Sequence, residues 1–246
     1  MGIAKIESFL TNRIEGFFNN RFHGDLEPVE LFQSLEREIL LKSKKVTGEL
    51  IAPNDFTFFL EESDYGRLSS KRVIDALYEI AERKVIKNDS FMDKDLKIRL
   101  QKDKTLEAGE FKLQACFTEN NDVESDAEEP HTIVLERSKF DVPLNLPNNP
   151  SLASLIVTEG NNEGATFELT DKMLYIGRRE KSDITLSDDK ISRLHAYITY
   201  ERHRHYLIDA GSLNGSYVND DRIDKAYIKD GDVIRLGETL LLYEVM

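Results

Sequence analysis

Short runs of alternating apolar and polar residues fill positions 151–246, and this pattern limits what the chain can fold into more than any other. Successive side chains of a β-strand point to opposite faces, so each run predicts a half-buried strand. Turn-forming pairs such as Asn214-Gly215 separate the runs, and many short strands at this spacing favour a sandwich or barrel. The expected strands are residues 155–158, 166–169, 174–176, 184–186, 196–200, 206–208, 216–218, 228, 233–236 and 240–243.

Residues 1–117 instead show the three- and four-residue apolar spacing of amphipathic helices, mixed with strand-like runs. Pro28 suits the first turn of a helix, because its missing N–H would have no partner there, and Ser69 or Ser70 can cap another helix. The predicted order is helix, helix, strand, helix, strand, strand, which is an α+β domain. The expected helices are residues 3–22, 28–40 and 70–85, and the expected strands are 56–60, 98–100 and 111–117.

A stretch of different composition, residues 118–150, separates these two parts. Six of the twelve residues 118–129 are acidic and almost none is apolar, which predicts a linker. Prolines and asparagines close the stretch. We therefore expect an α+β domain at residues 1–117, an acidic linker at 118–150 and an all-β domain at 151–246.

The net charge of −13 restricts the partners of this chain. Nucleic-acid binding draws most of its affinity from Lys and Arg that neutralise phosphates, so nucleic acid and anionic membrane surfaces are disfavoured. No apolar run reaches the roughly 18 residues that a membrane-spanning helix needs, and charged residues interrupt the stretch that a secretory signal would require. We expect no direct membrane insertion and a cytoplasmic protein, which a partner could recruit to the membrane.

Cysteine and histidine are too few for a conventional metal or catalytic centre. Cys116 is the only cysteine and is expected to be a strand thiol. His203 and His205 lack a third ligand, so an exposed hairpin is the simpler interpretation. Residues 1–117 contain a single histidine, His23, so neither a hydrolase triad nor a zinc site can be assembled conventionally. We expect no metal, no cofactor and no enzymatic activity.

Three clusters in the all-β part carry the candidate chemistry: YIGRR at residues 175–179, ISRLHA at 191–196 and DAGSLNGSYVN at 209–219. Together they resemble the forkhead-associated (FHA) domain, whose signature is Gly-Arg after a strand, then Ser-x-x-His, then Asn-Gly and a later Asn. The resemblance covers residues 152–246. It implies a β-sandwich of about 10–11 strands that binds phosphothreonine on partner proteins.

Phosphothreonine presents close to two negative charges and three acceptor oxygens, so its reader needs a planar cation and short donors on loops. Arg178 can supply the cation, and Arg193 is a second candidate phosphate contact. Ser192 can donate its hydroxyl. Asn214 can bridge the ligand backbone, because its amide both donates and accepts.

The resemblance also implies residues that support the site without binding. His195 would tie the binding loop together, Gly177 and Gly215 would meet backbone requirements, and Asn219 completes the signature. One position departs from the family, which often has Thr where this chain has Leu213. That departure bears on the selectivity for phosphothreonine over phosphoserine.

The N-terminal part resembles the domain that precedes FHA in bacterial FhaA-type proteins. The resemblance rests on residues 24–31, Gly-Asp-Leu-Glu-Pro-Val-Glu-Leu, and on the order of elements. It implies a bacterial signalling protein downstream of a Ser/Thr kinase, with links to cell-envelope or division regulation. The implied partners are phosphothreonine-containing proteins and a Ser/Thr protein kinase or pseudokinase.

Two further interpretations stay open. One is a scaffold protein whose degenerate FHA site binds partners without phosphate. The other concerns Thr132, which follows an acidic stretch and precedes three apolar residues. We hypothesise that a kinase phosphorylates Thr132 and that the chain's own FHA domain binds it; the alternative is that residues 132–135 form an edge strand.

Overall fold

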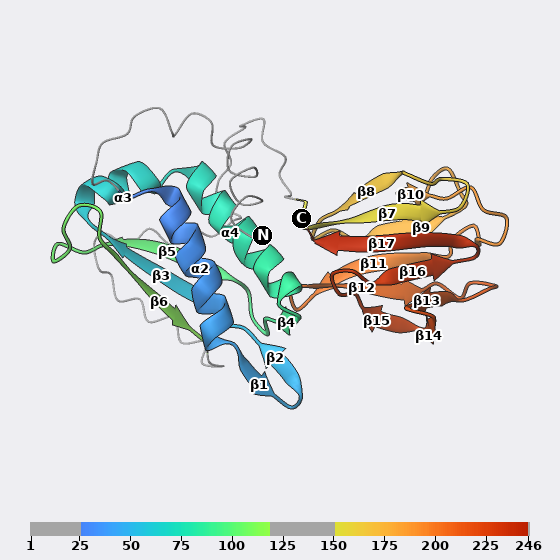
Figure 1. Cartoon of the computed structure of the whole chain (residues 1–246), viewed down its shortest axis with the longest axis horizontal. Coiled ribbons are helices and arrows are strands. Elements are labelled where there is room, and N and C mark those ends of the chain that lie inside the picture. Colours follow the sequence, from blue (N-terminus) through green and yellow to red (C-terminus); the bar gives the residue numbers. More distant parts are fainter. Residues whose placement is uncertain (1–25, 119–150, 246) are drawn as a thin grey trace.

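The computed structural model describes residues 26–118 and 151–245, which form two lobes side by side (Figure 1). The first lobe combines helices with small sheets, and the second consists of strands. The helix expected at residues 3–22 and the candidate phosphoacceptor Thr132 lie outside the described residues. Within the two described ranges, no helix combines the length and the apolar character needed to cross a membrane.

The first lobe contains three helices and six strands within residues 26–118. They are α2 (Pro28–Lys42), β1 (Lys44–Val46), β2 (Glu49–Ile51), β3 (Asp55–Leu60), α3 (Glu62–Leu68), α4 (Lys71–Lys87), β4 (Ser90–Phe91), β5 (Lys97–Lys102) and β6 (Phe111–Cys116). One sheet has the order β5-β3-β6, with β3 parallel to β5 and antiparallel to β6. A second sheet has the order β1-β2-β4.

Helix α2 begins at Pro28, as expected, and the Glu27 N–H donates to the Glu30 carboxylate 2.9 Å away. Helix α4 begins after Ser70, whose hydroxyl makes no capping hydrogen bond. The two helices pack together over the β5-β3-β6 sheet (Figure 1). Their apolar stripes and the inner face of the sheet form one core, and burying each large apolar side chain contributes about 1.5–3 kcal/mol.

The predicted α+β class of this lobe is confirmed, and three features are additional. Helix α3 and the β1–β2 hairpin were not expected, and neither was the two-residue strand β4. Strand β1 is exposed along its whole length, so no alternation marks it in the sequence. Cys116 ends strand β6 as a free, exposed thiol.

The second lobe is a β-sandwich of eleven strands within residues 151–245. They are β7 (Ala153–Glu159), β8 (Thr166–Leu169), β9 (Leu174–Gly177), β10 (Ile184–Thr185), β11 (Ala196–Glu201), β12 (Arg204–Asp209), β13 (Ser216–Val218), β14 (Asp221–Ile223), β15 (Lys225–Tyr227), β16 (Val233–Leu236) and β17 (Thr239–Val245). One sheet has the order β10-β9-β11-β12-β15 and the other β14-β13-β16-β17-β7-β8. The all-β prediction is therefore confirmed.

Most of the strands in this lobe lie where the alternation predicts them, with two errors. Strand β14 was not expected. The strand expected at Ile228 does not exist; β15 ends one residue earlier, and the buried Ile228 side chain follows it. Fully buried residues from both sheets, such as Ile198 and Leu241, fill the space between them.

The hairpin between β11 and β12 corrects another expectation, because its histidines are not exposed. His205 is fully buried, with its ring nitrogens 2.8 Å from the Tyr243 hydroxyl and 2.9 Å from the Thr170 carbonyl oxygen. This burial lowers the pKa of His205 to about 4. The side chain of His203 is only 14% exposed and contacts Glu82 of α4. Residues distant in the sequence cover both histidines, the first lobe at His203 and other parts of the sandwich at His205, so a local pattern cannot reveal their burial.

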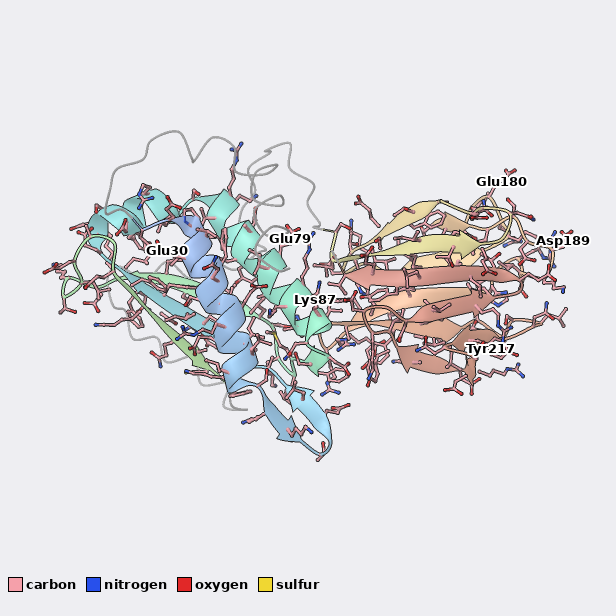
Figure 2. All side chains as sticks on the ribbon, in the orientation of Figure 1. Glu30, Glu79, Lys87, Glu180, Asp189 and Tyr217 are labelled. Atoms are coloured by element: carbon pink, nitrogen blue, oxygen red, sulfur yellow. The ribbon has the colours of Figure 1, made fainter. Side chains whose placement is uncertain are left out.

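The two ends of the sandwich face different surroundings. One end, with the β11–β12 hairpin, abuts the first lobe near Lys87, at the end of α4 (Figure 2). The loops that follow β9 and β10 lie at the opposite, outer end, where Figure 2 labels Glu180 and Asp189. The outer end is therefore open to a partner.

Candidate functional site

Arg178 follows strand β9 and starts the candidate site. Its backbone N–H donates to the Ser192 carbonyl oxygen at 3.1 Å, which fixes the Arg178 backbone beside the next loop. Its side chain is 48% exposed, and its guanidinium lies 3.5 Å from the fully exposed carboxylate of Asp189. Such exposed pairs stabilise by about 1 kcal/mol or less, so a doubly charged phosphate can displace Asp189.

Gly177 permits this close approach. A Cβ atom at this position would lie 2.9 Å from the carbonyl carbon of Arg193 and 3.1 Å from the Cα of Leu194. Both neighbours are backbone atoms, so no side-chain movement would relieve the clash. The glycine thus allows the backbone at Arg178 to lie against the loop that carries Ser192.

Ser192 and His195 form the second part of the site. The Ser192 hydroxyl oxygen accepts a hydrogen bond from the Leu213 N–H at 3.1 Å, which leaves its own proton free to donate. The Ser192 N–H donates to Nδ1 of the buried His195 at 3.1 Å, and His195 Nε2 lies 3.2 Å from the Gly215 carbonyl oxygen. This network assigns the ring proton to Nε2. His195 therefore links the two loops of the site.

Asp209, which the sequence analysis did not single out, shapes the loop after β12. One carboxylate oxygen accepts from the N–H groups of Gly211 (3.0 Å) and Ser212 (2.9 Å), and the other accepts from the hydroxyls of Ser212 (2.6 Å) and Ser216 (2.7 Å). Burial raises the pKa of Asp209, but these hydrogen bonds outweigh it, and the net pKa is lowered. An Asp two residues before a Gly in a loop is the signal that could have identified it.

The loop that Asp209 shapes presents two residues outward. Asn214 is exposed, and its side-chain N–H donates to the Lys190 carbonyl oxygen at 2.6 Å, which links the two loops. Leu213 is 86% exposed at the tip. Gly215 adopts a left-handed backbone with φ +79, as the Asn-Gly turn required.

Of the predicted site residues that the structure describes, all but Asn219 lie close together. Arg193 is exposed beside Ser192. Asn219 lies apart, at the far end of β13, where its amide contacts Asp232 (2.7 Å) and the Val233 N–H (3.0 Å). The remaining residues present a guanidinium, a hydroxyl and an amide at one open end of a rigid sandwich. Within residues 26–118 and 151–245, no cluster of His, Cys, Asp and Glu could hold a metal ion.

Two family models match separate parts of the chain. The FHA domain family model matches residues 174–237, and the family model of the FhaA N-terminal domain matches residues 3–114. The glycogen accumulation regulator GarA of Mycobacterium tuberculosis is 38% identical over 94 residues, which are 38% of this chain and 58% of GarA. The chain therefore spans less than two thirds of the length of GarA.

Two other proteins are similar to the same part of the chain. The oxoglutarate dehydrogenase inhibitor of Corynebacterium efficiens is 37% identical over 99 residues, 40% of this chain and 68% of the inhibitor. The FhaA FHA domain, solved in complex with the intracellular domain of Rv3910, is 30% identical, with a TM-score of 0.35; the match covers 37% of this chain and 99% of that domain. The chain belongs to the FHA-domain family and has the FhaA-type architecture, an FhaA N-terminal domain followed by an FHA domain.

Proposed function

We propose that this chain is a phosphothreonine-dependent binding adaptor of a bacterial Ser/Thr kinase pathway. The observation that carries the proposal is the half-exposed guanidinium of Arg178, whose partner among the described residues is the fully exposed carboxylate of Asp189 and whose backbone N–H is fixed on the Ser192 carbonyl oxygen. A phosphate bound there gains charge-assisted hydrogen bonds from a site that is already formed. Arg193 and Asn214 complete the proposed contacts.

The similar proteins support a regulator that acts by binding. GarA is a regulator of glycogen accumulation, and the Corynebacterium protein is an inhibitor of oxoglutarate dehydrogenase. We propose that the present chain is likewise a regulator, cytoplasmic and without enzymatic activity. Its proposed partners are phosphothreonine-containing proteins and a Ser/Thr kinase or pseudokinase. We also propose that the chain acts in cell-envelope or division regulation and that a partner recruits it to the membrane.

Two parts of the proposal concern the segment between the two described ranges. The boundaries of the linker, residues 118–150, follow from composition. Phosphorylation of Thr132 and its capture by the FHA domain of the same chain stay a hypothesis, which kinase treatment followed by mass spectrometry tests.

Replacing Arg178 tests the proposed site. We expect the full-length chain to bind members of a degenerate phosphothreonine peptide library and Arg178→Ala to bind them at least about tenfold more weakly, because a hydrogen bond to a charged group contributes about 1.5–3 kcal/mol. Isothermal titration measures the affinity. Arg179→Ala is the matched control, since Arg179 is the exposed neighbouring arginine and should leave affinity unchanged.

Two additional peptides complete this experiment. Unphosphorylated peptides should not bind, and phosphoserine peptides report how Leu213 affects selectivity. Binding that is indifferent to both phosphate and Arg178 would contradict the proposal and favour the phosphate-independent scaffold.

A further inference from the structure

The tip of the β11–β12 hairpin has residues that its own geometry disfavours. Arg202 and His203 form the two-residue turn, and both have a left-handed backbone, with φ 50 and 61. Turns of this kind favour Asn-Gly, and a left-handed backbone costs other residues roughly 1–2 kcal/mol each. Because the turn itself does not favour Arg-His, contacts outside the hairpin must offset this cost.

The N-terminal domain supplies those contacts. Arg202 donates to the Asp93 carboxylate at 2.7 and 3.0 Å and to the Glu49 carboxylate at 2.8 Å. His203 Nδ1 lies 2.7 Å from the Glu82 carboxylate, and its Nε2 lies 3.2 Å from the Lys94 carbonyl oxygen. Both turn side chains thus form hydrogen bonds to the other domain.

Arg204, the residue after the turn, is a fully buried cation. Its guanidinium lies 2.9 Å from the Asp89 carboxylate and 3.3 Å from the Ser90 carbonyl oxygen, both in the N-terminal domain, and 3.0 Å from the Ile228 carbonyl oxygen. A buried charge is stable only where hydrogen-bond partners surround it, and two of the three acceptors of Arg204 belong to the N-terminal domain.

Apolar and backbone contacts extend the same junction. Ile86 of α4 is 1% exposed and packs in the core of the sandwich. The Phe91 ring packs edge-on against Tyr227 at 5.2 Å. The Arg83 side chain donates to the Ser151 carbonyl oxygen at 2.7 Å. The contact is therefore a packed interface and not a set of surface ion pairs.

We propose that the hairpin tip, residues 201–204, is a docking element for the chain's own N-terminal domain, and that it holds the two domains as one rigid body. The recognition is electrostatic and shape-specific, since a run of Arg-His-Arg enters a group of carboxylates that we name the acidic seat: Glu49, Glu82, Asp89 and Asp93. This inference does not depend on the phosphate site. It gives the outer loops a fixed direction relative to the N-terminal domain.

Cutting the chain between the domains tests this docking. A recognition sequence for a site-specific protease is inserted after Ser138 in the full chain, and the cut protein is analysed by gel filtration at low micromolar concentration. We expect the halves to elute together at the 28.3 kDa of the whole chain. Wild-type halves that elute separately would overturn the proposal.

Variants show whether the acidic seat is responsible. The double variant Arg202→Ala with His203→Ala should weaken association of the cut halves at least about tenfold, because it removes several charge-assisted hydrogen bonds. Lys102→Ala is the matched control, because Lys102 pairs with Glu62 at 2.8 Å within one domain. Circular dichroism of the uncut variants verifies folding, and a double variant that associates like wild type would contradict a role for the hairpin tip.

A measurement on the uncut chain makes the test independent of cleavage. Spin labels on Lys45→Cys and Lys172→Cys, both exposed, are placed one in each domain in a Cys116→Ser background. Double electron–electron resonance should give one narrow distance distribution. A broad distribution would mean that the domains move independently and would overturn the proposal.

The docked hairpin should also respond to pH. The groups that face His203 are Glu82 from α4, Lys94 and Asp95 from the β4–β5 loop, and Tyr200 from β11. Burial lowers the pKa of His203, but the hydrogen bond and charge of Glu82 outweigh it, and the net pKa is raised. The protonated His203 therefore stabilises docking fully below the pKa that His203 has in the undocked state. This stabilisation is lost as the pH rises through the pKa of His203 in the docked state. We expect cut halves to associate more weakly at pH 9 than at pH 6, and His203→Gln to reduce this difference.

Discussion

Gly177→Ala should destabilise the FHA domain by about 3 kcal/mol, because the added methyl group meets backbone atoms that cannot move aside independently. Relief of the clash must separate β9 from the loop that carries Ser192 and Arg193. The hydrogen bond from the Arg178 N–H to the Ser192 carbonyl oxygen is then the first to weaken. Chemical denaturation followed by circular dichroism measures the loss, and amide hydrogen exchange at Arg178 locates it.

Gly66→Ala is the matched control for this prediction. Gly66 lies in helix α3, and a Cβ atom there would meet nothing within 4 Å. Since alanine favours a helix over glycine by about 1 kcal/mol, the same substitution should stabilise the chain there. A Gly177→Ala protein as stable as wild type, with unchanged exchange at Arg178, would show that the close approach does not constrain the site.

Asp209→Asn should have a comparable effect through a different mechanism. The new amide keeps the shape of the side chain but places an NH₂ group against donors from Gly211, Ser212 or Ser216. We expect a loss of roughly 3 kcal/mol in stability, since hydrogen bonds to a charged group contribute about 1.5–3 kcal/mol each. Phosphopeptide affinity should fall as well, because Asn214 lies on the loop that Asp209 shapes.

The lowered pKa of Asp209 gives this prediction a pH signature. A carboxylate whose folded pKa lies below its unfolded value contributes stability above the unfolded pKa, and this contribution is lost as pH falls through the folded pKa. The wild-type stability advantage over Asp209→Asn should therefore shrink in acid. Asp220→Asn is the control: Asp220 is exposed with φ 69, a conformation that Asn tolerates well, and it should change stability little. An acid dependence equal in both variants would contradict the assignment.

The sequence predicts the sandwich well because alternating apolar and polar residues mark most of its strands. Ile176, Ile198 and Leu241 lie at inward positions of long or central strands, where burial on one face enforces the pattern. Strand β14 could not be predicted, because its three residues are exposed or half-buried and their sequence resembles a turn. Helix α3 escapes for a similar reason, since it is only seven residues long and contains Gly66.

In the candidate site, too, some residues could be named from the sequence and others only from the structure. Arg178, Ser192 and Asn214 could be found because the motif spacing is local, and the β-sandwich framework brings the clusters to one end. The support from Asp209 was missed because its partners become apparent only when the loop folds back on it. The burial of His203 could not be predicted at all, since its partner Glu82 lies 121 residues earlier in the chain.

The position of Ile86 bears on how this protein should be handled and redesigned. A side chain of helix α4 packs in the sandwich core, so we expect isolated residues 151–246 to be less stable than the same residues in the whole chain. Moving residues 151–246 into a fusion protein or biosensor would leave an apolar hollow and strip Arg204 of its Asp89 partner. A fusion should therefore include helix α4 together with the sandwich. Otherwise Arg204 should be replaced by an apolar residue, and a larger apolar side chain should fill the space that Ile86 occupies.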